Sequence, residues 1–310
     1  MNSQTVRSDG GRFGAYALLT FTSLFWGGNA IAGQLAIGEI SPMSLTCLRW
    51  LLVSAGLAGF YHRDIKRALP VLWEHRFRLL LTGTLGFTVF NFLFYYSAHY
   101  TSAMNILIIQ GALPLPVILA LAVLYKQPVT YNQIAGMVLA FFGIVYLATR
   151  GSPGLLLDLD FNRGDLLMIL GCLVQAAYMI SIARKPPVSN EVLFCALAFA
   201  AFATSLPLLL TEIAAGATQM PTLKGFWVLT YVSIFPSTLA QIFFIHAISR
   251  IGPGRTGFFI NLVPVFGAGL AILLLGEQPQ YYHIISLACV VVGIVVVELR
   301  RSGQLSKTPD

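Results

Sequence analysis

The chain has 310 residues, of which 57% are hydrophobic and 10% charged, and its mean hydropathy is +0.78. Soluble domains normally carry about 25% charged residues, so this composition excludes an ordinary soluble protein and indicates an integral membrane protein. The formal net charge of +7 does not by itself indicate nucleic-acid binding, because the cytoplasmic loops of membrane proteins collect Lys and Arg.

Ten apolar stretches lie between polar breaks, and each is close to the roughly 20 residues that a helix needs to cross a bilayer. We therefore predict an all-α integral membrane fold with ten transmembrane helices. The stretches are 14–34, 43–61, 77–97, 101–124, 131–148, 164–183, 192–212, 225–247, 254–275 and 281–299.

The basic residues predict the orientation of these spans. With the N-terminus in the cytoplasm, 15 of the 19 Lys and Arg residues fall in cytoplasmic segments. Three fall outside (Arg150, Arg163 and Lys224), and Arg49 lies within a span. Ten spans return the C-terminus to the cytoplasm, so we expect a multi-pass protein of the plasma membrane, in bacteria the inner membrane, with both termini cytoplasmic. The charge bias then accounts for topology and leaves no nucleic-acid patch to explain.

Residues 1–150 and 151–310 read as two repeats with the same order of elements, each with five predicted spans. Five is an odd number, so the second half must enter the membrane upside down. Inverted repeats around a site at the midplane are typical of alternating-access transporters. The matched pairs, at offsets of 149 to 151 residues, are Ala98 with Ala247, Pro114 with Pro264, Pro128 with Pro279, Tyr131 with Tyr282 and Gly143 with Gly293.

The first two helices each carry a polar residue that is unusual in a span. For Asn29, an interhelical hydrogen bond is as good an explanation as a substrate contact. An Arg near the bilayer centre costs roughly 2.5 to 3.5 kcal/mol on insertion scales, so Arg49 is expected to face a bundle interior or a wet cavity, where it is a possible partner for a carboxylate. The alternative is that Arg49 lies near the membrane surface and snorkels outward or pairs with Glu39. Between the second and third helices, residues 61–78 read as a basic loop that anchors the topology and contacts anionic lipid.

Polar residues at steps of three and four form one stripe along the third helix, and this spacing predicts a single helical face turned toward a cavity. Its counterpart in the second half lies on the eighth helix, and we expect the two stripes to face each other. Taken singly, each of these residues is more often a packing hydrogen bond than a ligand contact, and the sequence leaves that alternative open. The candidate substrate-binding residues are Asn29, Asn91, Tyr95, Tyr100, Tyr178, Gln241 and His246.

Prolines interrupt the fourth and ninth helices. Pro114, Pro116 and Pro264, the last followed by Gly267, are expected to break the backbone ladder and form kinks, whether as hinges or as fixed bends. Residues 149–163 read as the linker between the halves.

Two other functional classes lack support in the sequence. The sequence contains no H-E-x-x-H or G-x-S-x-G motif, either of which would indicate an enzyme. It also contains no ring of charges or filter motif, which would indicate a channel. The four cysteines, Cys47, Cys172, Cys195 and Cys289, lie in apolar stretches without C-x-x-C spacing, so neither a disulfide framework nor a metal site is expected. We expect no cofactor.

Over residues 24–297 the chain resembles the drug/metabolite transporter superfamily in its ten-helix EamA-type branch, and it is most similar to the amino-acid exporters of the YddG type. The chain departs from the usual pattern of this family at two positions. Lys126 stands where the family usually has Glu, and the second half keeps that Glu as Glu277. Gln175 stands where the family commonly has Trp. The motifs are Trp26-Gly27 with Asn29, Pro42 followed by Arg49, the start of the fourth helix at 98–103, Pro114 with Gln127-Pro128, and Gly164-Asp165.

The resemblance implies a transporter that exports amino acids or related metabolites by alternating access, with a small-molecule substrate and membrane lipid as its partners. All twelve Asp and Glu residues lie in loops, tails or helix ends, whereas relatives that expel drug cations use a buried Glu in the first helix. This difference disfavours a cation–proton antiporter and favours a zwitterion with an apolar or aromatic part. An exporter or permease of another neutral or anionic metabolite is the alternative, and the oligomeric state is not specified.

Overall fold

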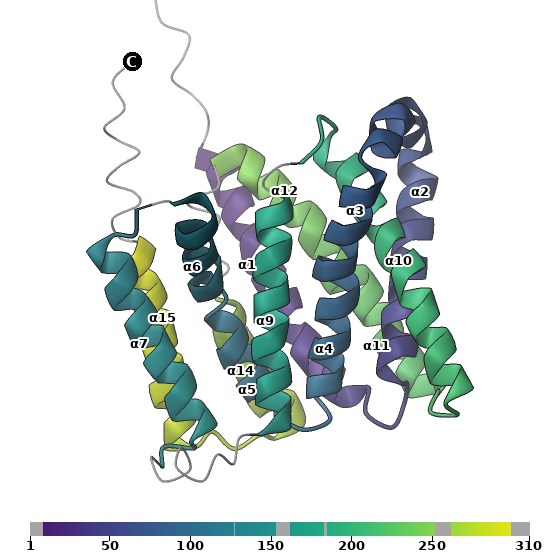
Figure 1. Ribbon diagram of the computed structural model, residues 1–310. Coiled ribbons are helices and arrows are strands. Elements are labelled where there is room, and N and C mark those ends of the chain that lie inside the picture. Colours follow the sequence, from purple (N-terminus) through teal and green to yellow (C-terminus); the bar gives the residue numbers. More distant parts are fainter. Residues whose placement is uncertain (1–8, 127, 153–161, 183–184, 252–261, 299–310) are drawn as a thin grey trace, which may run out of the picture.

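The computed structural model describes residues 9–126, 128–152, 162–182, 185–251 and 262–298. Every regular element in these residues is a helix, which confirms the predicted all-α class (Figure 1). The elements are α1 (Asp9–Leu35), α2 (Pro42–Glu74), α3 (Arg76–Gly83), η1 (Thr84–Val89), α4 (Phe90–Ser97), α5 (Ala103–Gly111), α6 (Pro114–Tyr125), α7 (Tyr131–Ala148), α9 (Arg163–Ile182), α10 (Asn190–Ala214), α11 (Leu223–Val232), η2 (Ser233–Leu239), α12 (Ala240–Ile251), α14 (Val263–Leu275) and α15 (Tyr281–Glu298).

Within this part of the chain, six helical stretches are long and apolar enough to cross a membrane. Three shorter apolar helices accompany them, at Tyr131–Leu147, Val263–Leu275 and Tyr281–Gly293. The six long stretches are Pro42–Glu74, Arg76–Ser97, Ala103–Leu124, Arg163–Ile182, Asn190–Ala214 and Leu223–Phe244.

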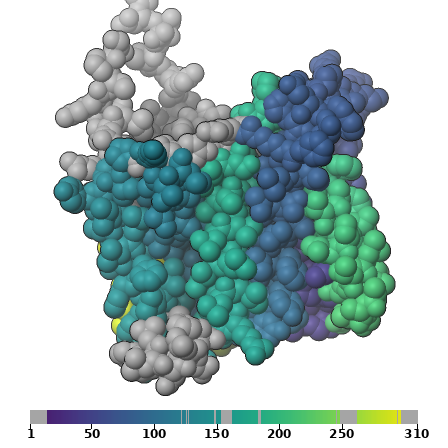
Figure 2. All heavy atoms as spheres, viewed as in Figure 1, coloured from purple at the N-terminus to yellow at the C-terminus, as the bar shows by residue number. Residues whose placement is uncertain are grey.

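The second helix is longer than the sequence predicts. α2 begins at Pro42 with Ser41 at its N-cap, as expected, but it continues through Tyr61, where φ is −107° and ψ is 17°, and ends at Glu74. The expected loop at 61–78 is therefore wrong, because Ile, Lys, Arg, Ala and Leu favour helix and continue the second helix almost to the start of α3. Together α2 and α3 project beyond the neighbouring helices, as Figure 2 shows at the upper right.

Proline positions agree with the predicted break in the fourth span. α5 ends at Gly111 and α6 begins at Pro114, since the residue before a proline is disfavoured in helix. Pro116 follows in the first turn of α6. In the second half, Pro264 lies in the first turn of α14, where a missing N–H is tolerated. Residues 254–261 of the ninth predicted span lie outside the described residues.

Two wide turns occupy matching places in the two halves. η1 and η2 are π-helical, and their first residues, Thr84 and Ser233, differ by 149 positions. Pro236 accounts for the second turn because it has no backbone N–H to donate. Such turns loosen the backbone ladder and often occur at functional sites.

Helices of the two halves also pack in matched combinations. α7 packs on α15, α2 on α10 and α5 on α14. α1 packs against α12 and α14, while α9 packs against α4 and α6. Each of these pairs joins a helix of residues 1–150 to a helix of residues 151–310.

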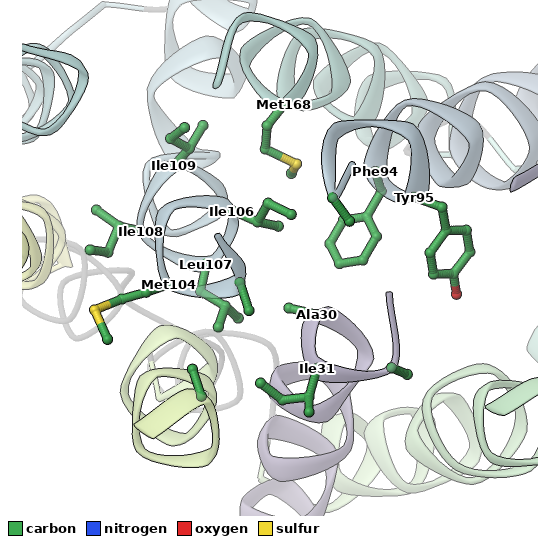
Figure 3. Packing of buried hydrophobic residues seen from close by; sticks show 14 of the residues in the cluster. Ala30, Ile31, Phe94, Tyr95, Met104, Ile106, Leu107, Ile108, Ile109 and Met168 are labelled. Carbon is green, nitrogen blue, oxygen red and sulfur yellow. The ribbon is translucent and has the colours of Figure 1, made fainter. Parts of the chain in front are cut away.

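The largest apolar core surrounds α5. Ile106, Leu107, Ile108 and Ile109 are all at most 2% exposed, so this helix is buried on every side. Tyr95 lies at the edge of the cluster with its hydroxyl turned away from the labelled aliphatic side chains (Figure 3). The core thus ends where a polar cluster begins.

The helix bundle has two faces, one at each end of its helices. α1 begins and α15 ends at the same face, at the top of Figure 1, which we call the terminal face. The connections 36–41, 98–102 and 215–222 lie at the other end of the helices, which we call the opposite face.

Candidate functional site

Arg49 lies inside the helix bundle and is only 4% exposed. It is the eighth residue of α2, so it is about 10 Å along the helix from the opposite-face end. Its position excludes the surface alternative, because a snorkelling side chain would reach solvent. The structure therefore agrees with the interior placement that the membrane cost of an arginine predicts.

Four neutral side chains bind the Arg49 guanidinium. Nε donates to Ser237 Oγ at 2.5 Å, and Nη1 donates to Asn91 Oδ1 at 3.0 Å and to Asn29 Oδ1 at 3.3 Å. Nη1 also donates to the Tyr95 hydroxyl. These residues come from α1, α2, α4 and η2, so the cluster joins the two halves of the chain.

Three of the four acceptors in this Arg49 cluster, namely Tyr95, Ser237 and Asn91, donate their own hydrogens to other groups. Tyr95 donates its hydroxyl to Asn29 Oδ1 at 2.9 Å, Ser237 donates to a backbone carbonyl at 2.5 Å, and the Asn91 amide donates to another at 2.5 Å. The oxygen lone pairs are thereby left to face the cation. Such an arrangement is built to hold a positive charge and to hold it in one orientation.

The two π-helical turns supply the backbone part of this arrangement. The carbonyl of Phe87 in η1 accepts from the Asn91 amide and from the Trp50 indole, at 2.5 and 3.0 Å. The matching carbonyl in η2, that of Pro236, accepts from the Trp26 indole at 3.1 Å. The wide turns free these carbonyls, because π-helical geometry displaces the regular hydrogen bonds.

Arg49 has no carboxylate partner in the part of the chain that the structure describes. The two ion pairs there join Arg67 to Asp64 and Lys224 to Glu39, at 3.7 and 3.5 Å. The predicted alternative of an Arg49–Glu39 pair is therefore wrong. Aromatic rings add some stabilisation, since Arg49 Cζ lies 5.3 Å from the Trp50 ring centre. In the described residues the buried cation is thus held by neutral groups alone, and no carboxylate balances its charge.

The structure brings together Arg49, Asn29, Asn91 and Tyr95 and places the other predicted residues elsewhere. Tyr100 is 44% exposed on the opposite face, where its hydroxyl lies 3.3 Å from that of Tyr96. The other three lie as follows: Tyr178 packs on Phe87 with ring centres 5.4 Å apart, Gln241 is half-buried one turn beyond Ser237, and His246 lies near the terminal-face end of α12. Of the predicted hinge residues, Gly267 instead lies in close packing with α1.

Sequence reasoning missed Ser237 and the indole of Trp50. Ser237 follows Pro236 in the middle of a predicted span, and a proline that breaks the backbone ladder there was the available signal. Trp50 directly follows Arg49 and stacks on Phe87 with ring centres 4.5 Å apart. Ser237 precedes Gln241 by four residues, which is the spacing of one helical turn, so the second stripe pointed toward its position without including it.

A second polar cluster joins α5, α9 and α15 near the opposite face. Asp165 is 3% exposed and accepts from Thr101 at 2.6 Å and from the Asn105 amide at 3.2 Å. The Asn105 oxygen lies 3.1 Å from His283 Nε2. Glu277 accepts from the backbone N–H groups of residues 103 and 104, at 2.9 and 3.2 Å, and so caps α5. These contacts fix helix ends and belong to a different part of the bundle from Arg49.

At the opposite face, hydrogen bonds join residues 36–41 to residues 212–224. Ser41 N donates to Gln219 O and Thr222 N donates to Glu39 O, both at 3.0 Å. Ser41 Oγ donates to Glu212 at 2.5 Å, and the Thr222 hydroxyl donates to the Glu39 carboxylate. The Thr222 hydrogen bond, followed by the Lys224 charge, holds the pKa of Glu39 below its ordinary value. We call this set of contacts the latch.

Replacing Glu39 by Gln is expected to open the latch more often, because it removes the ion pair with Lys224. A cysteine placed at the buried Ser44 behind the latch should then react about two to five times faster with a membrane-impermeant thiol reagent. In the wild type, the lowered pKa means that the charged latch persists through the ordinary Glu pKa and weakens only at still lower pH. Asp64→Asn, which removes the exposed ion pair in α2, is the matched control. Equal rates in Glu39→Gln and the control would contradict the latch.

A small pocket lies near the terminal face, between α2, α10 and α12. Its volume is about 10 Å³, which is room for roughly one water-sized group. The described residues contain no group of three or more His, Cys, Asp or Glu side chains placed to hold a metal ion. The lining residues are Leu57, Tyr61, Glu191, Phe194, Ile242 and His246.

The chain aligns with similar proteins over almost its whole length. The chain is 28% identical to an uncharacterized transporter of Archaeoglobus fulgidus, covering 92% of this chain and 98% of that protein. It is 25% identical to the uncharacterized transporter YyaM of Bacillus subtilis, covering 90% and 92%. A protein named as a probable terminal-alkyne amino-acid exporter, from Streptantibioticus cattleyicolor, is 22% identical, covering 89% and 87%.

The fold has a counterpart among solved structures. One crystal structure aligns with a TM-score of 0.63 and 20% sequence identity, covering 91% of this chain and 96% of the other. Residues 13–149 and, separately, residues 162–299 match the EamA-like transporter family. The chain therefore belongs to the EamA-like transporter family of the drug/metabolite transporter superfamily and is a multi-pass membrane transporter.

Proposed function

We propose that this transporter exports amino acids with apolar or aromatic side chains, and that Arg49 binds their carboxylate. The observation that carries the proposal is a buried arginine whose hydrogen-bond partners are all neutral, with no carboxylate partner in the described residues. A buried cation without a counter-ion is unfavourable, so an anionic ligand gains more there than at a surface. The arginine fork matches a carboxylate in shape as well as charge.

Aromatic side chains next to the cluster support an apolar or aromatic substrate. Trp50 and Phe87 stack beside Arg49, and Tyr178 packs on the same Phe87 ring. Aromatic rings bind apolar groups over a large area and leave polar tips for hydrogen bonds. The relative named as a probable terminal-alkyne amino-acid exporter supports the same class of substrate.

Ten spans in two inverted five-helix repeats are part of this proposal. Three observations support them: the family matches twice along the chain, the helix contacts of the halves correspond, and the π-helical turns are 149 residues apart. Two such halves can exchange conformations, which moves the opening from one face to the other.

The direction of export follows from the charges and the two faces. Arg63, Lys66, Arg67, Arg76 and Arg78 gather where α2 and α3 meet at the terminal face, so this face is assigned to the cytoplasm and both chain ends with it. The hydrogen bonds of the latch lie at the opposite face, and the pocket lies near the terminal face. Substrate accordingly enters from the cytoplasm, and the latch must open for its release.

Counterflow in proteoliposomes tests the proposal. Vesicles loaded with unlabelled L-phenylalanine should take up labelled L-phenylalanine with saturation, and phenylalanine amide, which lacks the carboxylate charge, should compete at least about tenfold less well. A current without saturation would indicate a channel instead. Equal competition by the acid and the amide would contradict a carboxylate site. An anionic metabolite without an ammonium group is the second candidate, because Arg49 alone would also accept it.

A further inference from the structure

We propose that the pocket between α2, α10 and α12 is an access subsite that binds the ammonium group of the substrate through Glu191. This inference rests on the proposed function and extends it, because it makes the substrate a zwitterion that is recognised at two separate places. The carboxylate partner is Arg49, and the ammonium partner lies on the terminal side of it.

The size of the pocket fits an ammonium group. A volume of about 10 Å³ admits roughly one water-sized group, which describes an ammonium but not an aromatic ring. Leu57, Phe194 and Ile242 form apolar walls, so a charged group placed here is partly removed from water. Electrostatic attraction is stronger in such surroundings than at an open surface.

The charge of the pocket comes from Glu191. Glu191 lies in the first turn of α10, where the helix dipole favours a negative charge. Neither of the two ion pairs in the described residues uses it. Tyr61 faces it from α2 and His246 from α12, while Lys185, which precedes α10, donates to Asn190. The pocket therefore offers one carboxylate, that of Glu191, to bind a cation.

The spacing along the helices separates this subsite from Arg49. Leu57 follows Arg49 by eight residues in the same helix, which corresponds to about 12 Å along the axis. The ammonium and carboxylate of one amino acid are bonded to the same carbon, so they cannot reach both places at once. Glu191 therefore binds the ammonium first, on the cytoplasmic side, and the substrate then moves toward the opposite face until its carboxylate reaches Arg49.

This sequence of events predicts a selective effect of Glu191→Gln. Initial rates of transport are compared for L-phenylalanine and for the 2-hydroxy acid with the same side chain, which keeps the carboxylate but lacks the ammonium. In Glu191→Gln, the KM for phenylalanine is expected to rise about tenfold, because the amide attracts a cation far less than a carboxylate does. The KM for the hydroxy acid is expected to stay within about twofold.

Two further variants make the comparison specific. Glu74→Gln removes an exposed carboxylate at the end of α2, outside the pocket, and is expected to change neither KM. Glu191→Asp keeps the charge and is expected to restore most of the preference for phenylalanine. A purely structural role at the start of α10 would instead lower the transport of both substrates alike, without changing the preference between them. Recovery of folded protein is checked by size exclusion for each variant.

The possible outcomes distinguish a failure of the ammonium subsite from a failure of the proposed function. An equal rise of both KM values, or no rise in either, would overturn the ammonium subsite while leaving the carboxylate site intact. If the wild type carried the hydroxy acid but not phenylalanine, the subsite would again be excluded. If the wild type carried neither acid with saturation, the proposed function itself would be wrong, and the subsite with it.

Discussion

Replacing Arg49 by Gln is expected to reduce saturable amino-acid transport about 100-fold while leaving the protein folded. Gln removes the charge that the substrate carboxylate binds, yet its amide still donates to some of the acceptors that now surround the guanidinium. The buried positive charge disappears with the substitution, so the protein loses an unfavourable term together with the favourable hydrogen bonds. The measurement is initial-rate counterflow in proteoliposomes, with size exclusion as the test of folding.

Arg49→Lys separates charge from shape. Lys keeps the positive charge but has one nitrogen, which cannot donate to Ser237 on one side and to Asn91 and Tyr95 on the other. We expect about tenfold lower transport than in the wild type and a larger remaining activity than in Arg49→Gln. Arg67→Gln, on the exposed part of α2, is the control and should transport normally. Normal transport by Arg49→Gln would remove this residue from the site.

Replacing Gly27 by Val is expected to prevent assembly of the helix bundle. A Cβ atom on Gly27 would lie 2.8 Å from the backbone nitrogen of Gly267 and 3.0 Å from the carbonyl oxygen of Val263. Both neighbours are backbone atoms of α14, so no side chain can rotate away, and α1 and α14 would have to separate. Overpacking of this kind costs about 3 kcal/mol or more, and close approach through small residues is a main source of helix association in membranes.

Gly56→Val is the matched control for this substitution. Gly56 is also in a membrane helix, α2, but a Cβ atom added there meets nothing within 4 Å. We expect Gly27→Val to aggregate or to unfold at a much lower temperature in detergent, whereas Gly56→Val should elute as the wild type does. Similar melting temperatures for the two variants would show that the α1–α14 contact is less important than its geometry indicates.

The sequence predicts the helical class, and it gives the interior position of Arg49 as one of two alternatives, for physical reasons that do not depend on contacts with distant residues. Apolar stretches of bilayer length have few alternatives to helix, and a membrane arginine must find partners. Pro42 and Pro114 mark helix starts through their own backbone restrictions. Membrane length alone does not predict the extension of α2 to Glu74, because it marks only the apolar part of the helix, although the residues beyond Tyr61 favour helix as well.

The composition of the site depends on contacts between distant residues, which spacing along one helix does not specify. Asn91 and Tyr95 are four residues apart and were found by periodicity, because they share a face of one helix. Ser237 is 188 residues from Arg49, and its place depends on how η2 is rotated against α2. Gln241 and His246 are not among the groups that bind the Arg49 guanidinium in the described residues, although their spacing resembles that of the first stripe.

Equilibrium binding to the purified transporter is the most direct measurement of whether Arg49 holds a substrate carboxylate. Titration calorimetry compares L-phenylalanine with phenylalanine amide, and the wild type with Arg49→Gln. The first comparison removes the carboxylate charge of the ligand, and the second removes the guanidinium charge of the protein. The wild type is expected to bind the acid at one site per chain and about 10 to 100 times more tightly than the amide, while Arg49→Gln should bind both with similar, weak affinity. Equal affinity of the wild type for the acid and the amide, or an undiminished preference for the acid in Arg49→Gln, would contradict the role of Arg49.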